Sequence, residues 1–225
     1  MEKHGQEIAK SLLNRYLWLK KNDYRVRTIQ PANIYISPDG KELNFVDLRS
    51  LVKGQPDSIH ELHGSMPYNC QSMWTKKERI DLSTFLDIWS VGMVLLELIA
   101  GTKLVTGIKY FFNCEDLLDE LEQYVDKVTM LLLKDMLNDG DDDEIEAYVR
   151  EILEMNPNAI AENIRAVNAA VEESTVLREI EEKNMEALRQ SPEHHQLLFG
   201  LKMEDVEESS EEEDPEEDTV SEDMN

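Results

Sequence analysis

DIWSVGMVLLELIAG, the segment from Asp87 to Gly101, is the most informative part of this 225-residue chain. Its apolar residues cover almost the whole circumference of a helix, and the glycine at its end is a natural helix stop. We therefore predict a helix over residues 81–100 that is surrounded by protein on all sides. The segment is too short to span a bilayer, and because it contains Ser90 and Glu97 it is also too polar.

The flanking sequence predicts a mainly α-helical chain with one small β-hairpin. Apolar residues at helical spacing predict an amphipathic helix over residues 6–21. Two short alternating runs flank Pro38-Asp39-Gly40, a tight-turn sequence, and predict the hairpin. Residues 49–77 form a predicted long irregular segment, which inside a domain usually has a function. From Glu115 onward the pattern is helical almost continuously.

Net charge limits the classes of partner that this chain can bind. Forty-eight Asp and Glu residues against 23 Lys and Arg residues give a formal charge of -25. Such a chain repels phosphate backbones and anionic membranes, so we expect no nucleic-acid and no membrane partner, and basic proteins fit better. The first residues contain no apolar signal core, and two cysteines suggest reduced thiols. We therefore expect an intracellular location, cytoplasmic or nuclear.

The acidic residues are concentrated in a C-terminal tail. Residues 204–224 carry 13 acidic residues and no basic one, which predicts a disordered tail over residues 204–225. The preceding patterns predict a compact domain over residues 1–156 and a helical extension over residues 157–203. The extension either packs back on the domain or binds a partner. The tail either keeps the protein soluble or is phosphorylated by acidophilic kinases at sites with Glu three residues on: Ser209, Ser210 and Thr219.

The central helical segment resembles part of a known protein family. It is similar to D-x-W-S-x-G-x-x-x-x-E-L-x-x-G, a buried helix in the large C-terminal lobe of eukaryotic protein kinases, and seven marked positions match at fixed spacing. The resemblance covers residues 6–153 and implies the fold of that lobe. It assigns structural roles to Asp87, Trp89, Gly92 and Glu97. Trp89 is expected in the core, and Asp87 is expected to accept backbone N–H bonds from an upstream loop.

Three loop segments also resemble this lobe, with altered residues. RTIQPANIYI resembles the catalytic loop, where Val26, Arg27 and Thr28 stand at His-Arg-Asp, Gln30 stands at Lys, and Pro31 and Asn33 are kept. FVDLRSL resembles the Asp-Phe-Gly segment, where Asp47 is kept and Leu48 and Arg49 replace Phe and Gly. GSMPYNCQS resembles the end of the activation segment, where Gly64 and Tyr68 match.

These replacements imply that the loop holds no catalytic residue. Thr28 stands at the family's catalytic Asp and, as an alcohol, is a very poor base near neutral pH. Gln30 lacks the charge of the family's catalytic-loop Lys. Only 25 residues precede Val26, and no G-x-G-x-x-G loop or strand-borne V-A-I-K Lys is present. We therefore expect that the small lobe, which in the family holds half of the nucleotide site, is missing from this chain.

Asn33 and Asp47 are the residues that the resemblance assigns to metal and ATP binding. Two oxygen ligands without a Lys clamp make a weak magnesium site. In the alternative interpretation Asn33 caps the loop backbone, and Asp47 forms a turn cap or an ion pair, for which Arg49 is adjacent. We expect no cofactor, with ATP and magnesium as the alternative.

Three functional hypotheses follow from these features. The first is a truncated, non-catalytic pseudokinase-like protein that acts as a scaffold or regulator in signalling and binds other proteins, a kinase or a basic protein among them. The second is a Ser/Thr-type protein kinase fragment that binds ATP or transfers phosphate with a small lobe supplied by another chain. The third is a binder of basic proteins that acts through its acidic tail.

Overall fold

Helix α3 (Phe85–Ala100) is the element around which the other helices pack in this computed structural model. The structure describes residues 2–38, 40–54, 67–69, 85–106, 114–138, 140–154, 156 and 158–190. The chain divides into two units, residues 1–187 and residues 188–225. The description below concerns the first unit.

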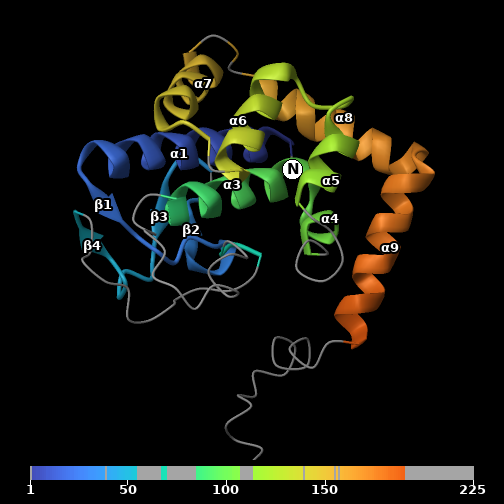
Figure 1. Cartoon of the computed structure of the whole chain (residues 1–225), viewed down its shortest axis with the longest axis horizontal. Helices are drawn as coiled ribbons and strands as arrows, with labels where there is room; N and C mark the ends of the chain where they lie inside the picture. Colours follow the sequence, from blue (N-terminus) through green and yellow to red (C-terminus); the bar gives the residue numbers. More distant parts are fainter. Residues whose placement is uncertain are drawn as a thin grey trace, which may run out of the picture. The chain divides into compact units, whose positions relative to one another are not determined.

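Within the described part of the chain, four helices make the main contacts with α3, which explains why its sequence is apolar on nearly every side. They are α1 (Glu2–Lys21), α4 (Thr102–Thr106), α6 (Lys127–Leu137) and α8 (Ala159–Glu173). Figure 1 shows α1 and α3 running side by side. Along α3 the side chains with almost no exposed surface are Val91, Met93, Leu95, Leu96 and Ile99. Burial of these side chains supplies the main driving force for assembling the helices.

The remaining helices are amphipathic and cover this central layer. α5 (Cys114–Leu121) packs on α6, α7 (Asp142–Glu154) packs on α6 and α1, and α9 (Thr175–Gln190) follows α8. The start of α6 is tied to α8, because the Asp126 carboxylate accepts the backbone N–H groups of Val128 and Thr129 and the side-chain amide of Asn163. Asn163 in turn accepts the Asp126 N–H at 3.0 Å. The buried Asn163 and the half-buried Asp126 thus fix the start of α6 against α8.

Two small antiparallel sheets precede the central helix. The predicted hairpin is present, with β2 (Ile34–Ile36) paired to β3 (Leu43–Phe45) so that Ile34 lies opposite Phe45 and Ile36 opposite Leu43. Gly40 adopts a positive φ of 75° in its turn, which glycine tolerates without strain. A second sheet pairs β1 (Tyr24–Arg25) with β4 (Val52–Lys53), and β4 lies inside the segment 49–77 that we predicted to be irregular. Strands of two residues show no alternation by which a sequence could reveal them.

The predictions of helices and of the fold class can now be compared with the structure. The chain is mainly helical, as predicted, and the first helix begins at Glu2 rather than at residue 6. The central helix is described from Phe85, and residues 81–84 lie outside the described part. In the described part of the chain, no helix has both the length and the apolar character needed to cross a membrane.

The helical extension packs back on the helices that precede it. α8 contacts α1 and α3, and within α9 the buried Asn184 donates to the carbonyl oxygens of Lys103 and Leu104 at 3.1 and 2.9 Å. The residues of α9 up to position 187 belong to the first unit. The domain boundary at residue 156 stays a sequence prediction. The tail and its three candidate phosphorylation sites lie outside the described residues.

Replacing Gly92 with Ala should destabilise the protein. A Cβ at Gly92 would lie 2.9 Å from Met136 Cβ and 3.0 Å from Leu137 Cδ2, so α6 would have to move away from α3. Overpacking of this kind costs about 1–3 kcal/mol. Gly5→Ala is the matched control, because its Cβ meets only Ile164 Cδ1, the flexible end of a side chain. Urea denaturation should show the larger loss for Gly92→Ala, and equal midpoints would contradict this account.

The contribution of Asp126 should depend on pH. Burial opposes ionisation of this carboxyl, but hydrogen bonds from Thr129 and Asn163 outweigh it, so its pKa in the folded protein lies below the ordinary value. Its stabilisation is therefore present above the unfolded-state pKa and is lost as pH falls through the folded-state pKa. The loss of unfolding free energy in Asp126→Asn, about 1 kcal/mol for a helix cap, should be larger at pH 7 than at strongly acidic pH.

Denaturant titrations of wild type and variant at the two pH values test this prediction. The exposed Glu182→Gln serves as the control for the loss of one carboxylate. A difference between wild type and Asp126→Asn that stays constant with pH would show that the carboxylate charge has no part in the cap.

Candidate functional site

The loop that resembles a kinase catalytic loop is held in place by one carboxylate. Asp87, in the first turn of α3, accepts the backbone N–H of Val26 at 2.6 Å through Oδ2 and that of Arg27 at 2.7 Å through Oδ1. Arg27 has a φ of 65°, a left-handed conformation that is uncommon for a residue other than glycine. The two hydrogen bonds thus hold a strained backbone that is 60 residues away in sequence.

The environment of Asp87 explains why this carboxylate is structural. Its side chain is only 4% exposed, and burial raises the pKa of the carboxyl. The N–H groups of Arg27 and Val26 oppose that shift, as do the charges of Arg25 and Arg27. Because both of its oxygens accept backbone N–H groups of the loop, Asp87 positions the loop.

Thr28 lies at the position that the resemblance assigns to the catalytic base, and its hydroxyl is already engaged. The side chain is buried and donates to the carbonyl oxygen of Asp47 at 3.0 Å. This bond joins the loop to the segment that follows β3. Gln30, at the position of the family's catalytic-loop Lys, is half-buried just before the short 3-10 helix η1 (Pro31–Asn33).

Asn33 and Asp47 belong to two segments that hydrogen bonds join, residues 28–33 and residues 46–47. The side-chain amide of Asn33 donates to the backbone carbonyl oxygen of Thr28 at 3.0 Å. The backbone carbonyl oxygen of Asn33 accepts the N–H of Val46 at 2.9 Å. Asn33 therefore caps the loop backbone. Because Thr28 also reaches Asp47, the side chains of Thr28 and Asn33 and the backbone at residues 46–47 form one connected network.

Both carboxylate oxygens of Asp47 contact the guanidinium of Arg49. The Nε–Oδ1 distance is 3.0 Å and the Nη2–Oδ2 distance is 2.8 Å, a bidentate ion pair. Hydrogen bonding to Asp47 raises the pKa of Arg49. The Arg49 side chain is 88% exposed, whereas that of Asp47 is 18% exposed, so the cation lies over the carboxylate from the solvent side. In this structure the Arg49 cation satisfies the Asp47 carboxylate, the ion pair that was the alternative to metal binding for this residue.

The remaining marked residues of α3 hold a different segment, residues 67–69. The indole of Trp89 donates to the carbonyl oxygen of Pro67 at 3.0 Å, and Tyr68 donates its hydroxyl to Glu97 Oε2 at 2.6 Å. Burial, followed by the bond to Glu97, raises the pKa of Tyr68. Trp89, which we expected in the core, is half-buried at the edge of the core, where its indole N–H bonds to the backbone of residue 67. Tyr68 and Glu97 lie in two separate motifs of the sequence, and neither motif indicates the hydrogen bond between them.

Other reactive groups in the described residues do not form a second site. No group of three or more His, Cys, Asp or Glu side chains there has the geometry to hold a metal ion. Cys114 is a buried free thiol, and burial raises its pKa to about 12. Such a thiol is almost fully protonated near neutral pH and is a poor nucleophile.

Comparison with known proteins connects this geometry to protein kinases. No protein-family profile matches the chain. The chain is 28% identical over 127 residues to the mitogen-activated protein kinase MKC1 of Candida albicans. The matched region covers 54% of this chain and 24% of that kinase, so the chain spans about a quarter of the length of this relative. The similarity supports a protein-kinase-like relationship over part of the chain.

Removing the Asp87 carboxylate should strongly destabilise the protein. Asp87→Ala leaves the N–H groups of Val26 and Arg27 buried without an acceptor, at about 1–3 kcal/mol for each group. We expect a total loss of about 2–4 kcal/mol in urea denaturation, and hydrogen exchange at both amides should accelerate. The exposed Glu179→Ala is the control and should change stability little. Unchanged exchange at Val26 and Arg27 would contradict an anchoring role.

Proposed function

We propose that this chain is a non-catalytic, pseudokinase-like protein that acts by binding other proteins. The observation that carries the proposal is the bidentate ion pair between Asp47 and Arg49. By resemblance, Asp47 stands where a kinase holds magnesium, and here a guanidinium from the same chain occupies both of its oxygens. The internal cation replaces the metal electrostatically and carries out no chemistry.

The missing base supports the same proposal. A kinase needs a carboxylate that accepts the proton of the substrate hydroxyl, and a positioned base of this kind contributes about 10²- to 10⁴-fold to the rate. The Thr28 side chain ends in a hydroxyl, which here is the donor in a hydrogen bond to the backbone carbonyl oxygen of Asp47. Gln30 supplies no charge for a transferring phosphoryl group. The loop retains its shape through Asp87 and lacks the groups that the reaction needs.

The part left for function is a rigid helical body with surfaces for partners. The C-terminal extension and the acidic residues 204–225 are proposed docking elements, and the tail's charge suits basic proteins. The activity of the Candida albicans kinase is a property of that protein. The alternative, nucleotide binding by this chain, is the outcome that the following experiment is designed to detect.

Nucleotide should not stabilise this protein. In a thermal unfolding assay with millimolar ATP and magnesium, we expect the same Tm with and without nucleotide, because the proposed protein does not bind it. A ligand that does bind and is present at about 100 times its Kd would add roughly 2.7 kcal/mol of stability and raise the Tm. Phosphoryl transfer to a generic basic substrate should stay at background. Stabilisation by ATP and magnesium that disappears in Asp47→Ala would overturn the proposal and would favour a nucleotide-binding role.

Arg49→Gln is a matched variant for the same assay. It removes the cation from Asp47 and leaves the carboxylate in place. Because Arg49 is largely exposed, the substitution should not affect folding. If the ion pair alone blocks the site, Arg49→Gln should gain weak magnesium-dependent stabilisation that the wild type lacks. A wild type that responds to magnesium as strongly as Arg49→Gln would show that the ion pair blocks nothing.

A further inference from the structure

The N-terminal quarter of the chain carries the opposite charge to the rest. Residues 1–53 contain ten Lys and Arg residues and six Asp and Glu residues, a formal charge of +4, whereas residues 54–225 carry -29. These first residues form α1 and all four described strands. The surface built by α1 and the two small sheets is therefore cationic on an otherwise strongly acidic protein.

Exposed apolar side chains gather in the same part of the molecule. Among the described residues, six large apolar side chains are exposed, and five of them lie between positions 18 and 51: Trp18, Tyr35, Val46, Leu48 and Leu51. Scattered exposed apolar residues need no explanation, but a concentration of this kind marks an interaction surface. Trp18, Leu48 and Leu51 line one hollow, which is described below.

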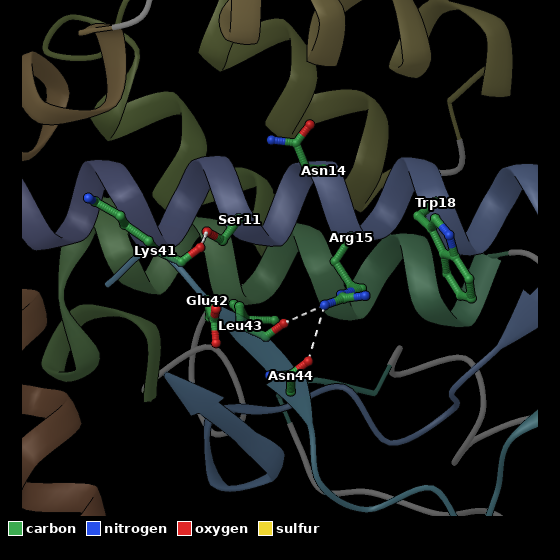
Figure 2. Close-up of a pocket in the computed structure, with 8 residues that line it drawn as sticks. All are labelled: Ser11, Asn14, Arg15, Trp18, Lys41, Glu42, Leu43 and Asn44. Carbon is green, nitrogen blue, oxygen red and sulfur yellow. Dashed lines mark hydrogen bonds between the residues drawn. The ribbon is translucent and has the colours of Figure 1, made fainter. Parts of the chain in front are cut away.

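A polar hollow of about 580 Å³ lies between α1 and the β2–β3 hairpin. Figure 2 shows Arg15 in its middle, with Trp18 near one end and Lys41 near the other. Arg15 Nη2 donates to the Leu43 carbonyl at 3.0 Å and to Asn44 Oδ1 at 3.1 Å. These bonds fix the guanidinium in place. Its Nε and Nη1 have no partner among the residues that the structure describes, so they are available donors.

An apolar hollow of about 350 Å³ adjoins the polar one and shares Arg15, Trp18 and Asn44 with it. Its other lining residues are Leu19, Tyr24, Val26, Phe45, Leu48 and Leu51. Trp18 stacks on Tyr24 with the ring centroids 5.8 Å apart and the planes 2° from parallel. The stacked indole of Trp18 thus lies beside both the apolar hollow, which can hold an apolar side chain, and the Arg15 guanidinium, which can bind a carboxylate.

We propose that the joined hollows, called here the α1 groove, dock an extended segment of a partner protein that combines a large apolar side chain with adjacent carboxylates. The apolar side chain would lie against Leu48 and Leu51, and a carboxylate would pair with Arg15. Charge selects this occupant, because the Arg15 guanidinium attracts a carboxylate to one of its remaining N–H groups, at Nε or Nη1, and repels a basic segment. The inference rests on the proposed protein-binding function, and it adds an acidic partner to the basic ones that the tail suits.

Fluorescence anisotropy with the full chain tests the groove. The probe is a fluorescein-labelled peptide of sequence DEFLED, and its basic counterpart KKFLKK serves as the comparison. We expect the acidic probe to bind, the basic peptide not to compete, and added salt to weaken binding because the contact with Arg15 is electrostatic. Displacement of the acidic probe by the basic peptide as effectively as by unlabelled DEFLED would overturn the proposal, whereas binding of the basic peptide to the acidic tail displaces nothing from the groove.

Two pairs of variants separate the groove from general effects. Leu48→Glu and Arg15→Gln should each weaken binding of the acidic probe about ten-fold. Val176→Glu and Arg178→Gln, on α9, are the controls, since Val176 is 48% exposed and Leu48 is 51% exposed. Arg15→Gln also removes two bonds to β3, so Leu48→Glu, a surface change only, keeps the test valid if Arg15→Gln does not fold. Unchanged binding by Leu48→Glu would overturn the proposal.

Deletion of residues 204–225 distinguishes the partner from this chain's own acidic tail. If the acidic probe binds only after the deletion, the tail occupies the groove and the proposal of a separate partner is overturned. Failure of the probe to bind, with no stabilisation by ATP and magnesium, would remove only the α1 groove. Nucleotide stabilisation that depends on Asp47 would remove the proposed function whether or not the probe binds.

Discussion

Two hydrogen bonds from the backbone of Val26 and Arg27 to the buried carboxylate of Asp87 connect the N-terminal part of the chain to its central helix. The acceptor is buried, so loss of either bond would leave a polar group without water or partner. The left-handed backbone at Arg27 depends on these bonds. Through Thr28 and Asn33 the same anchor positions the segment that carries Asp47.

This arrangement separates the shape of a catalytic loop from its chemistry. The shape depends on backbone groups and on one carboxylate that lies outside the loop. By resemblance, the chemistry of such a loop depends on positions 28, 30 and 47, where this chain has Thr28, Gln30 and Asp47. Arg49 satisfies the Asp47 charge without a metal ion.

Several features could be predicted from sequence because their signals are local. The periodicity of residues 87–100 indicated a buried helix, and the alternation around Pro38 indicated the β2–β3 hairpin. The β1–β4 pair was missed because two-residue strands have no periodicity. The edge position of Trp89 and the bond between Tyr68 and Glu97 were also missed, since both depend on a segment more than 20 residues away. Nothing local indicates which loop an apolar helix will hold.

The sequence by itself determined the kinds of elements, the acidic balance and the presence of Thr28 and Gln30 in the loop that resembles a kinase catalytic loop, because each is a property of residue type or short spacing. Only the tertiary structure decided which partners those residues have. Asp87 meets amides about 60 residues away. Arg15 and Leu48 come to one groove because α1 and β3 pack together. Such pairings arise from burial of the whole core, which no short segment can specify.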